Sequence, residues 1–111
     1  MNWIALTDEN ELGTIKELSK SRPQLIFKHS TRCSISSMAK SRLERSEQPE
    51  IADFHFLDLI KFRTLSNKIA DDFSVHHQSP QVLLIKNMEC VYEESHNGID
   101  MAEITEQIQL H

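Results

Sequence analysis

The 111 residues of this chain have the length of one domain, and a composition of 39% hydrophobic and 26% charged residues is typical of a globular protein. The formal net charge of -5 gives little electrostatic support for binding phosphate backbones, so we expect no nucleic acid partner. The apolar run at residues 3–6 is much shorter than a signal-peptide core, and no later run reaches the roughly 20 residues that span a bilayer. We therefore expect a single domain over residues 1–111, located in the cytoplasm, with no membrane partner.

The first half of the chain alternates between strand-like and helix-like segments. Residues 3–6 suit a short additional strand, and a capping pair at residues 7–8 predicts a helix that ends before Pro23. The apolar run at residues 24–29 is typical of a buried strand, and from Cys33 the apolar spacing becomes helical. The apolar residues expected to face the core are Leu12, Ile15 and Leu18 in the first helix, and Ile35, Met38, Ala39 and Leu43 in the second.

The second half continues the alternation and then changes it. Residues 54–60 predict another strand, and residues 62–73 carry a helical stripe. Two strands at residues 81–86 and 90–95 are joined by a connection of hairpin length, and a last helix follows a cap at Asp100. The apolar residues of these two helices are Phe62, Leu65, Ile69, Ala70 and Phe73, and Met101, Ile104 and Ile108.

The order of these elements predicts an α/β fold with a central mixed sheet. After the first helix the order is strand, helix, strand, helix, strand, strand, helix. Strands joined through a helix run parallel with a right-handed crossover, whereas strands joined by a short turn run antiparallel. We therefore expect one sheet with both kinds of pairing, flanked by helices.

Cys33 is a lone thiol at the junction of a strand and a helix, in the segment "FKHSTRCSISSMA". An isolated cysteine is most often a packing residue. At helical spacing, however, the apolar face of the following helix points about 200° away from Cys33, so we expect the thiol to be exposed or nearly exposed. A helix N-terminus stabilises an anion, and we expect Lys28, Arg32 and the hydroxyls of Thr31 and Ser36 to favour the nucleophilic thiolate further.

This segment resembles the active-site segment of the monothiol bacilliredoxin (YtxJ-like) family, whose members have a thioredoxin fold. The stretch "HQSPQVLLI" at residues 77–85 is similar to the family's segment around the proline that faces the cysteine, and "SHNGID" at residues 95–100 resembles its Ser-His turn before the last helix. Two residues depart from the family pattern. Arg32 stands where threonine is usual, and Ser34 replaces the proline that usually follows the cysteine.

The resemblance implies a thioredoxin-like fold and a monothiol disulfide oxidoreductase. Cys33 would be the catalytic nucleophile, and Ser36 would close the Cys-x-x-Ser motif without being able to form a disulfide. No cofactor would be bound. The co-substrate would be bacillithiol, the small thiol of bacteria that lack glutathione, or a similar thiol, and the partners would be S-thiolated client proteins. The residues expected to bind substrate are Thr31, Arg32, Ser79, Pro80 and His96.

Cys90 is expected to be a packing residue rather than a second redox thiol. If Pro80 lies beside Cys33, the strand at residues 81–86 carries the chain away from the site, and Cys90 follows the far turn. A disulfide needs Cα atoms within about 7 Å, so Cys90 is not expected to pair with Cys33. The returning strand brings His96 back toward the site, where it would contact the small thiol or stand as a turn histidine without a role.

Three further expectations complete this interpretation. His76 and His77 are adjacent and have no accompanying ligand spacing, so we expect a structural or surface role and no metal site. The Ser79–Pro80 peptide bond is expected to be cis, because the resemblance places Pro80 at the family's active-site proline. The alternative function is a thioredoxin-fold binding or adaptor module for the stress response, in which Cys33 performs no turnover.

Overall fold

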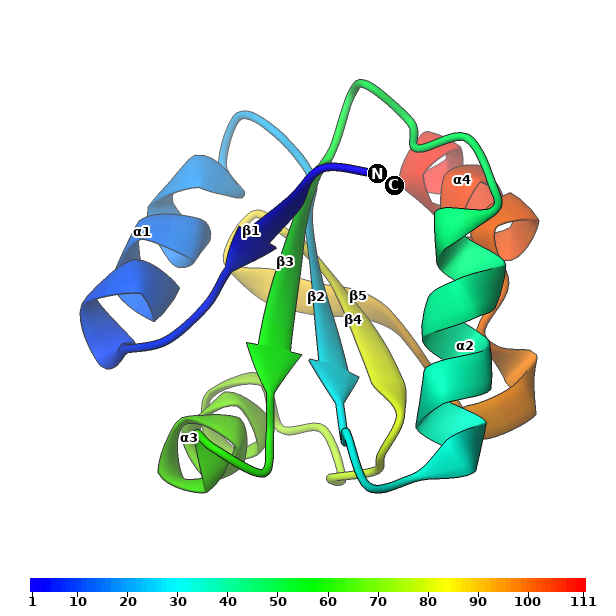
Figure 1. Ribbon diagram of the computed structural model, residues 1–111. Coiled ribbons are helices and arrows are strands. Elements are labelled where there is room, and N and C mark those ends of the chain that lie inside the picture. Colours follow the sequence, from blue (N-terminus) through cyan, green and yellow to red (C-terminus); the bar gives the residue numbers. More distant parts are fainter.

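The structure, a computed structural model, describes residues 1–111 as a five-stranded sheet with helices on both faces (Figure 1). The strand order is β1-β3-β2-β4-β5, in which β1, β3 and β2 are parallel and both β4 and β5 join by antiparallel pairing. The predicted mixed α/β sheet is confirmed. The elements are β1 (Trp3–Ala5), α1 (Glu9–Leu18), β2 (Gln24–His29), α2 (Ser34–Glu44), β3 (Asp53–Asp58), α3 (Arg63–Phe73), β4 (Gln81–Lys86), β5 (Glu89–Ser95), a 3₁₀ turn η1 (His96–Gly98) and α4 (Met101–Leu110).

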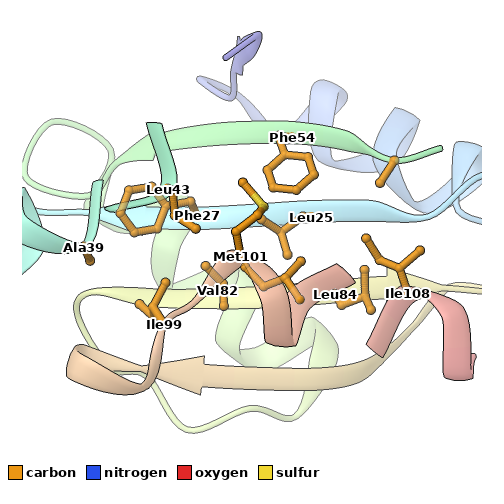
Figure 2. Close-up of a cluster of buried hydrophobic side chains, with 12 residues drawn as sticks. Leu25, Phe27, Ala39, Leu43, Phe54, Val82, Leu84, Ile99, Met101 and Ile108 are labelled. Carbon is orange, nitrogen blue, oxygen red and sulfur yellow. The ribbon is translucent and has the colours of Figure 1, made fainter. Parts of the chain in front are cut away.

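The central strand β2 separates two hydrophobic cores. All six of its residues are buried, and successive side chains point to opposite faces of the sheet. Leu25 and Phe27 point toward α2 and α4, where they meet Val82 and Leu84 of β4 (Figure 2). On the other face, α1 and α3 cover a second core whose members include Ile26, Leu57, Ile69, Leu83 and Ile85.

The predicted helix starts are largely correct. Asp8 caps α1, since its carboxylate accepts from the Glu11 N–H while the Glu11 side chain accepts from the Asp8 N–H. Asp100 caps α4 by accepting from the Glu103 N–H. None of the helices combines the length and the apolarity that crossing a membrane requires.

The predicted core face of α2 is wrong in part. Ile35 and Met38 are 40% and 59% exposed, whereas Ser36, Ala39 and Leu43 face the sheet. Ser36 can occupy a core position because its hydroxyl has hydrogen-bonding partners there, which removes the cost of burying it. In α1, Leu18 is likewise exposed, because the helix ends there and the chain turns at Ser19.

The hairpin between β4 and β5 is tighter than predicted. Lys86 pairs with Glu89, so β5 begins one residue earlier and the loop contains only Asn87 and Met88. Both loop residues have positive φ, 52° and 67°, as in the two-residue turns whose twist matches antiparallel strands. Their N–H groups donate to the backbone oxygen and the hydroxyl of Ser19, which fix the hairpin against the end of α1.

Candidate active site around Cys33

Cys33 lies at the carboxyl end of β2, where the chain enters α2. It is the N-cap residue of α2, its N–H donates to the Ser30 carbonyl at 3.2 Å, and its carbonyl accepts from the Ser37 N–H. The side chain makes no capping hydrogen bond, and no acidic residue stands in the first turn of the helix. The thiol is half-buried, so it is less accessible than the exposed or nearly exposed position that the helical spacing predicts. The structure therefore presents a free thiol at the N-terminus of a helix whose first turn carries no acidic residue.

Ser36 is fully buried and its hydroxyl is committed to two partners. It accepts from the Ser30 N–H at 3.0 Å and lies 2.6 Å from Nδ1 of His29. Burial, with a smaller contribution from the positive charge of Lys40, lowers the pKa of His29, so Nδ1 of the neutral imidazole can accept a hydrogen bond from the Ser36 hydroxyl. Ser36 therefore ties the loop that carries Cys33 to the end of β2.

Pro80 and His96 meet at the same end of the sheet. The Ser79–Pro80 bond is cis, which confirms that prediction. The His96 N–H donates to the Pro80 carbonyl at 3.0 Å, and the His96 carbonyl accepts from the Arg42 guanidinium of α2 at 3.2 Å. The expectation that the returning strand brings His96 to Pro80 is thus correct. Because β2 and β4 are neighbours, the loop that carries Cys33 and the loop that carries Pro80 adjoin the same end of these strands (Figure 1).

The other predicted binding residues, Thr31, Arg32 and Ser79, differ in how exposed they are. Thr31 and Arg32 are exposed on the loop before Cys33, and Thr31 lines a polar hollow together with Lys40. The Ser79 hydroxyl is buried and has no hydrogen-bonding partner in the protein. These positions leave Thr31 and Arg32 available to a molecule bound at Cys33.

The expectation that Lys28 assists the thiol is wrong. Lys28 precedes Cys33 by five residues, yet the alternation of β2 turns its side chain to the face covered by α3. Its ammonium donates to the Ser66 carbonyl at 3.0 Å and approaches Nδ1 of His77 at 3.2 Å. His77 therefore has a structural contact, which agrees with the structural or surface role expected of it.

Cys90 lies in β5, beside the end of β4 that is farthest from Pro80. It pairs with Ile85 of β4, and its thiol donates to the Tyr92 carbonyl at 3.3 Å. Burial raises the pKa of this thiol to about 11, which disfavours the reactive thiolate at neutral pH. Both cysteines are free, and Cys90 packs against the core under α1 and α3, as predicted.

The comparison with protein families decides which proteins this chain is related to. The family model of the monothiol bacilliredoxin BrxC matches residues 4–104. The chain belongs to this family. The match includes Cys33, Pro80 and His96, so the segments that carry the resemblance in the sequence all lie within it.

Solved structures similar to this chain share its thioredoxin fold. A protein described as a candidate oxidoreductase with a thioredoxin fold has a TM-score of 0.79 and 27% identity, over 94% of this chain and 91% of that chain. Thioredoxin from Fasciola hepatica has a TM-score of 0.72 and 18% identity, over 96% and 97% of the two chains. Thioredoxin from Malassezia sympodialis has a TM-score of 0.76 and 13% identity, over 99% and 90%. The fold and the family together support a thiol-disulfide oxidoreductase.

Sequence reasoning misses two parts of this site. The sequence pattern indicates only that His29 ends one strand and that Gln81 begins another. In the structure His29 is the partner of Ser36, and the Gln81 side chain binds the loop before Pro80. The one signal in the sequence is that each of these polar residues stands at the end of an otherwise apolar run. Such residues are buried only with partners, and the partners become evident only once the chain has folded.

Proposed function

We propose that this protein removes a small thiol from mixed disulfides of client proteins through Cys33 alone. The Cys33 thiolate attacks the small-thiol sulfur of the mixed disulfide, which forms a Cys33–small thiol disulfide and expels the client thiolate. A second small-thiol anion then attacks the adduct sulfur, which releases a symmetric small-thiol disulfide and regenerates the Cys33 thiolate. Both steps exchange one disulfide for another, so neither needs a bound cofactor.

The observation that carries this proposal is the separation of functions within the Cys-x-x-Ser motif. Cys33 presents a free thiol at the helix N-terminus, while the Ser36 hydroxyl is occupied by Ser30 and His29. The remaining cysteine, Cys90, lies at the other end of β4 with a raised pKa. An adduct on Cys33 therefore has no neighbouring thiol to resolve it, and a second small thiol is needed.

Membership of the bacilliredoxin family supports bacillithiol as that small thiol. The proposed setting is a reducing compartment such as the bacterial cytoplasm, where two unpaired cysteines remain reduced. Thr31, Arg32, Ser79, Pro80 and the His96 turn are the proposed contacts of the small thiol or of the client segment that carries it.

The test follows removal of bacillithiol from a thiolated client protein by mass spectrometry. We expect Cys33→Ser to abolish the reaction and Cys90→Ser, the matched control, to leave it largely unchanged. An intact-mass measurement should also find a bacillithiol adduct on the wild-type protein that Cys33→Ser lacks. Comparable losses in the two variants would contradict the single-thiol mechanism, and full activity in Cys33→Ser would contradict the proposed function.

A further inference from the structure

Lys28 is a fully buried lysine without a carboxylate partner. Its side chain forms no ion pair, and its ammonium contacts only the Ser66 carbonyl of α3 and the Nδ1 atom of His77. Burial lowers the pKa of Lys28 to about 8, which expresses the cost of keeping a charge there. A leucine or methionine at this position would avoid the free-energy cost of burying a charge. The stability of the fold therefore does not explain why an amine with these contacts stands here.

Gln81 lies beside Lys28 and binds the same loop. The two residues pair directly across β2 and β4, and both are fully buried. Paired residues of antiparallel strands point to the same face, so both side chains project toward α3. The Gln81 amide donates to the His76 carbonyl at 3.0 Å, and its oxygen accepts from the Gln78 N–H at 3.4 Å.

These contacts fall on three consecutive residues immediately before Ser79 and Pro80. Gln81 holds the backbone of residues 76 and 78, and Lys28 holds the side chain of His77 between them. Buried polar contacts of this kind fix a loop more firmly than apolar packing because each has a required geometry. Residues 76–78 are thus held by side chains on the α3 face of the sheet, opposite the face that α2 and Cys33 adjoin.

We infer, on the basis of the thiol exchange proposed above, that Lys28 and Gln81 are positioning residues that hold the 76–80 loop in the place that client binding requires, and that protonation of His77 releases it. We call Lys28, Gln81 and His77 the loop latch. Neutral His77 accepts from the Lys28 ammonium, whereas protonated His77 has no acceptor and repels it.

The charges around His77 favour such a release. Burial contributes most to lowering its pKa, followed by Lys28 of β2, Arg63 of α3 and the adjacent His76. All three of these neighbouring groups are basic, so none stabilises an imidazolium. The nearby acidic group, Glu93 of β5, accepts from the Gln81 amide at 3.1 Å and is not among the groups that shift the pKa of His77. At neutral pH the loop latch therefore holds the 76–80 loop in place. As the pH falls through the lowered pKa of His77, the contact between Lys28 and His77 is lost and the loop is released.

The first experiment measures amide hydrogen exchange of the 75–81 segment, with all variants compared at the same pH. We expect Lys28→Met to exchange about tenfold faster than wild type at neutral pH. Ile26→Val, on the same strand and face, is the control for a core change that leaves the loop latch intact. If Lys28→Met does not fold, His77→Ala tests the same contact from the loop side.

The second arm tests the protonation step with His77→Asn, which keeps an acceptor near the Nδ1 position but cannot be protonated. In a series from about pH 7.5 down to about pH 4, we expect equal rates at the upper end and exchange in wild type that becomes up to about tenfold faster than in His77→Asn as the pH falls. His76→Asn, an exposed neighbour, should keep this dependence on pH. Equal exchange of wild type and His77→Asn at every pH would overturn the release on protonation.

The last experiment tests whether Lys28 positions the loop for client binding or only stabilises the fold. With a bacillithiolated client, Lys28→Met should raise KM about tenfold while kcat and the alkylation rate of Cys33 stay near wild type. Exchange in Lys28→Met equal to that of Ile26→Val, or an unchanged KM, would overturn the inference. If wild type itself fails to act on the client, the proposed function falls, and hydrogen exchange still decides whether the loop latch exists.

Discussion

The Ser36 hydroxyl oxygen lies 2.6 Å from Nδ1 of His29, and both side chains are buried. The pair joins the first turn of α2 to the last residue of β2, on either side of the loop that carries Cys33. A residue that the motif identifies with redox chemistry is therefore also part of the structure that positions Cys33.

Ser36→Ala should destabilise the protein by about 1–3 kcal/mol, because it leaves the Ser30 N–H and His29 Nδ1 without partners. Urea denaturation measures the change. Ser37→Ala, at the next and exposed position of the same helix, is the control and should change stability by less than about 0.5 kcal/mol. Equal effects of the two substitutions would show that the hydrogen bonds of Ser36 contribute nothing measurable.

Ser36→Cys should convert the monothiol site to a dithiol site. The introduced thiol would attack the Cys33–small thiol disulfide, form an internal disulfide and expel the small thiol. Mass spectrometry of the pre-formed adduct should show this release without added free thiol. The adduct of Ser37→Cys, in which the new thiol is exposed and one residue further along α2, should persist. A persistent adduct in Ser36→Cys would mean that the buried position cannot reach Cys33.

Cys33 should be alkylated by iodoacetamide at neutral pH, whereas Cys90 should react only after unfolding. Cys90 is packed against the core, and burial raises its pKa to about 11, so little thiolate is present. Peptide mapping after a short exposure to the reagent distinguishes the two sites. Faster labelling of Cys90 than of Cys33 in the folded protein would contradict this assignment.

The stability of the folded protein should rise between about pH 8 and pH 9 because of Lys28. Its folded pKa is about 8, whereas the unfolded chain holds the proton up to the ordinary value of 10.5. The unfolded state therefore binds more protons in this window, and the free energy of unfolding increases with pH by about 1 kcal/mol per pH unit. Tm measurements should show this rise in wild type and its loss in Lys28→Met. Parallel curves for the two proteins would contradict it.

The window ends near pH 9 because Cys90 acts in the opposite direction above that value. Its folded pKa of about 11 exceeds the ordinary 9.0, so the folded state then binds the additional proton and stability falls as the pH rises. Comparison with Lys28→Met cancels this contribution, since Cys90 is present in both proteins.

Met88→Gly should stabilise the hairpin by about 0.5–1 kcal/mol. Met88 has a φ of 67° in a two-residue turn, a conformation that glycine adopts without the strain of a side chain, and its 42% exposure means that little packing is lost. Thermal unfolding measures the gain. Met88→Ala keeps the Cβ and should bring no such gain, so an equal effect of both substitutions would indicate that the side chain of Met88, rather than its backbone, is responsible.

Local patterns in the sequence determined the order of the elements and the place of Cys33 at the junction of a strand and a helix. The caps at Asp8 and Asp100, the apolar run of β2 and the helical spacing after Cys33 each depend on residues close together in the chain, so they could be identified without knowing the fold. The motif segments then placed Pro80 and the His96 turn beside one another, which the hydrogen bond between their backbones confirms.

Tertiary structure decided which polar residues are buried and which groups they bind. The strand β2 is buried on both faces, so its sequence carries no alternation that could show where Lys28 points. Ser36 took the core position predicted for Ile35 and Met38 because His29 and Ser30, brought back by the turn into α2, satisfy its hydroxyl. Gln81 pairs with Lys28 across β4 and β2, so its side chain lies on the same face of the sheet, where it binds the loop before Pro80. The partners of Lys28 are distant in sequence, whereas Ser36 and Gln81 bind groups only a few residues away. In each case the buried polar residue acquires its partner only when the chain has folded.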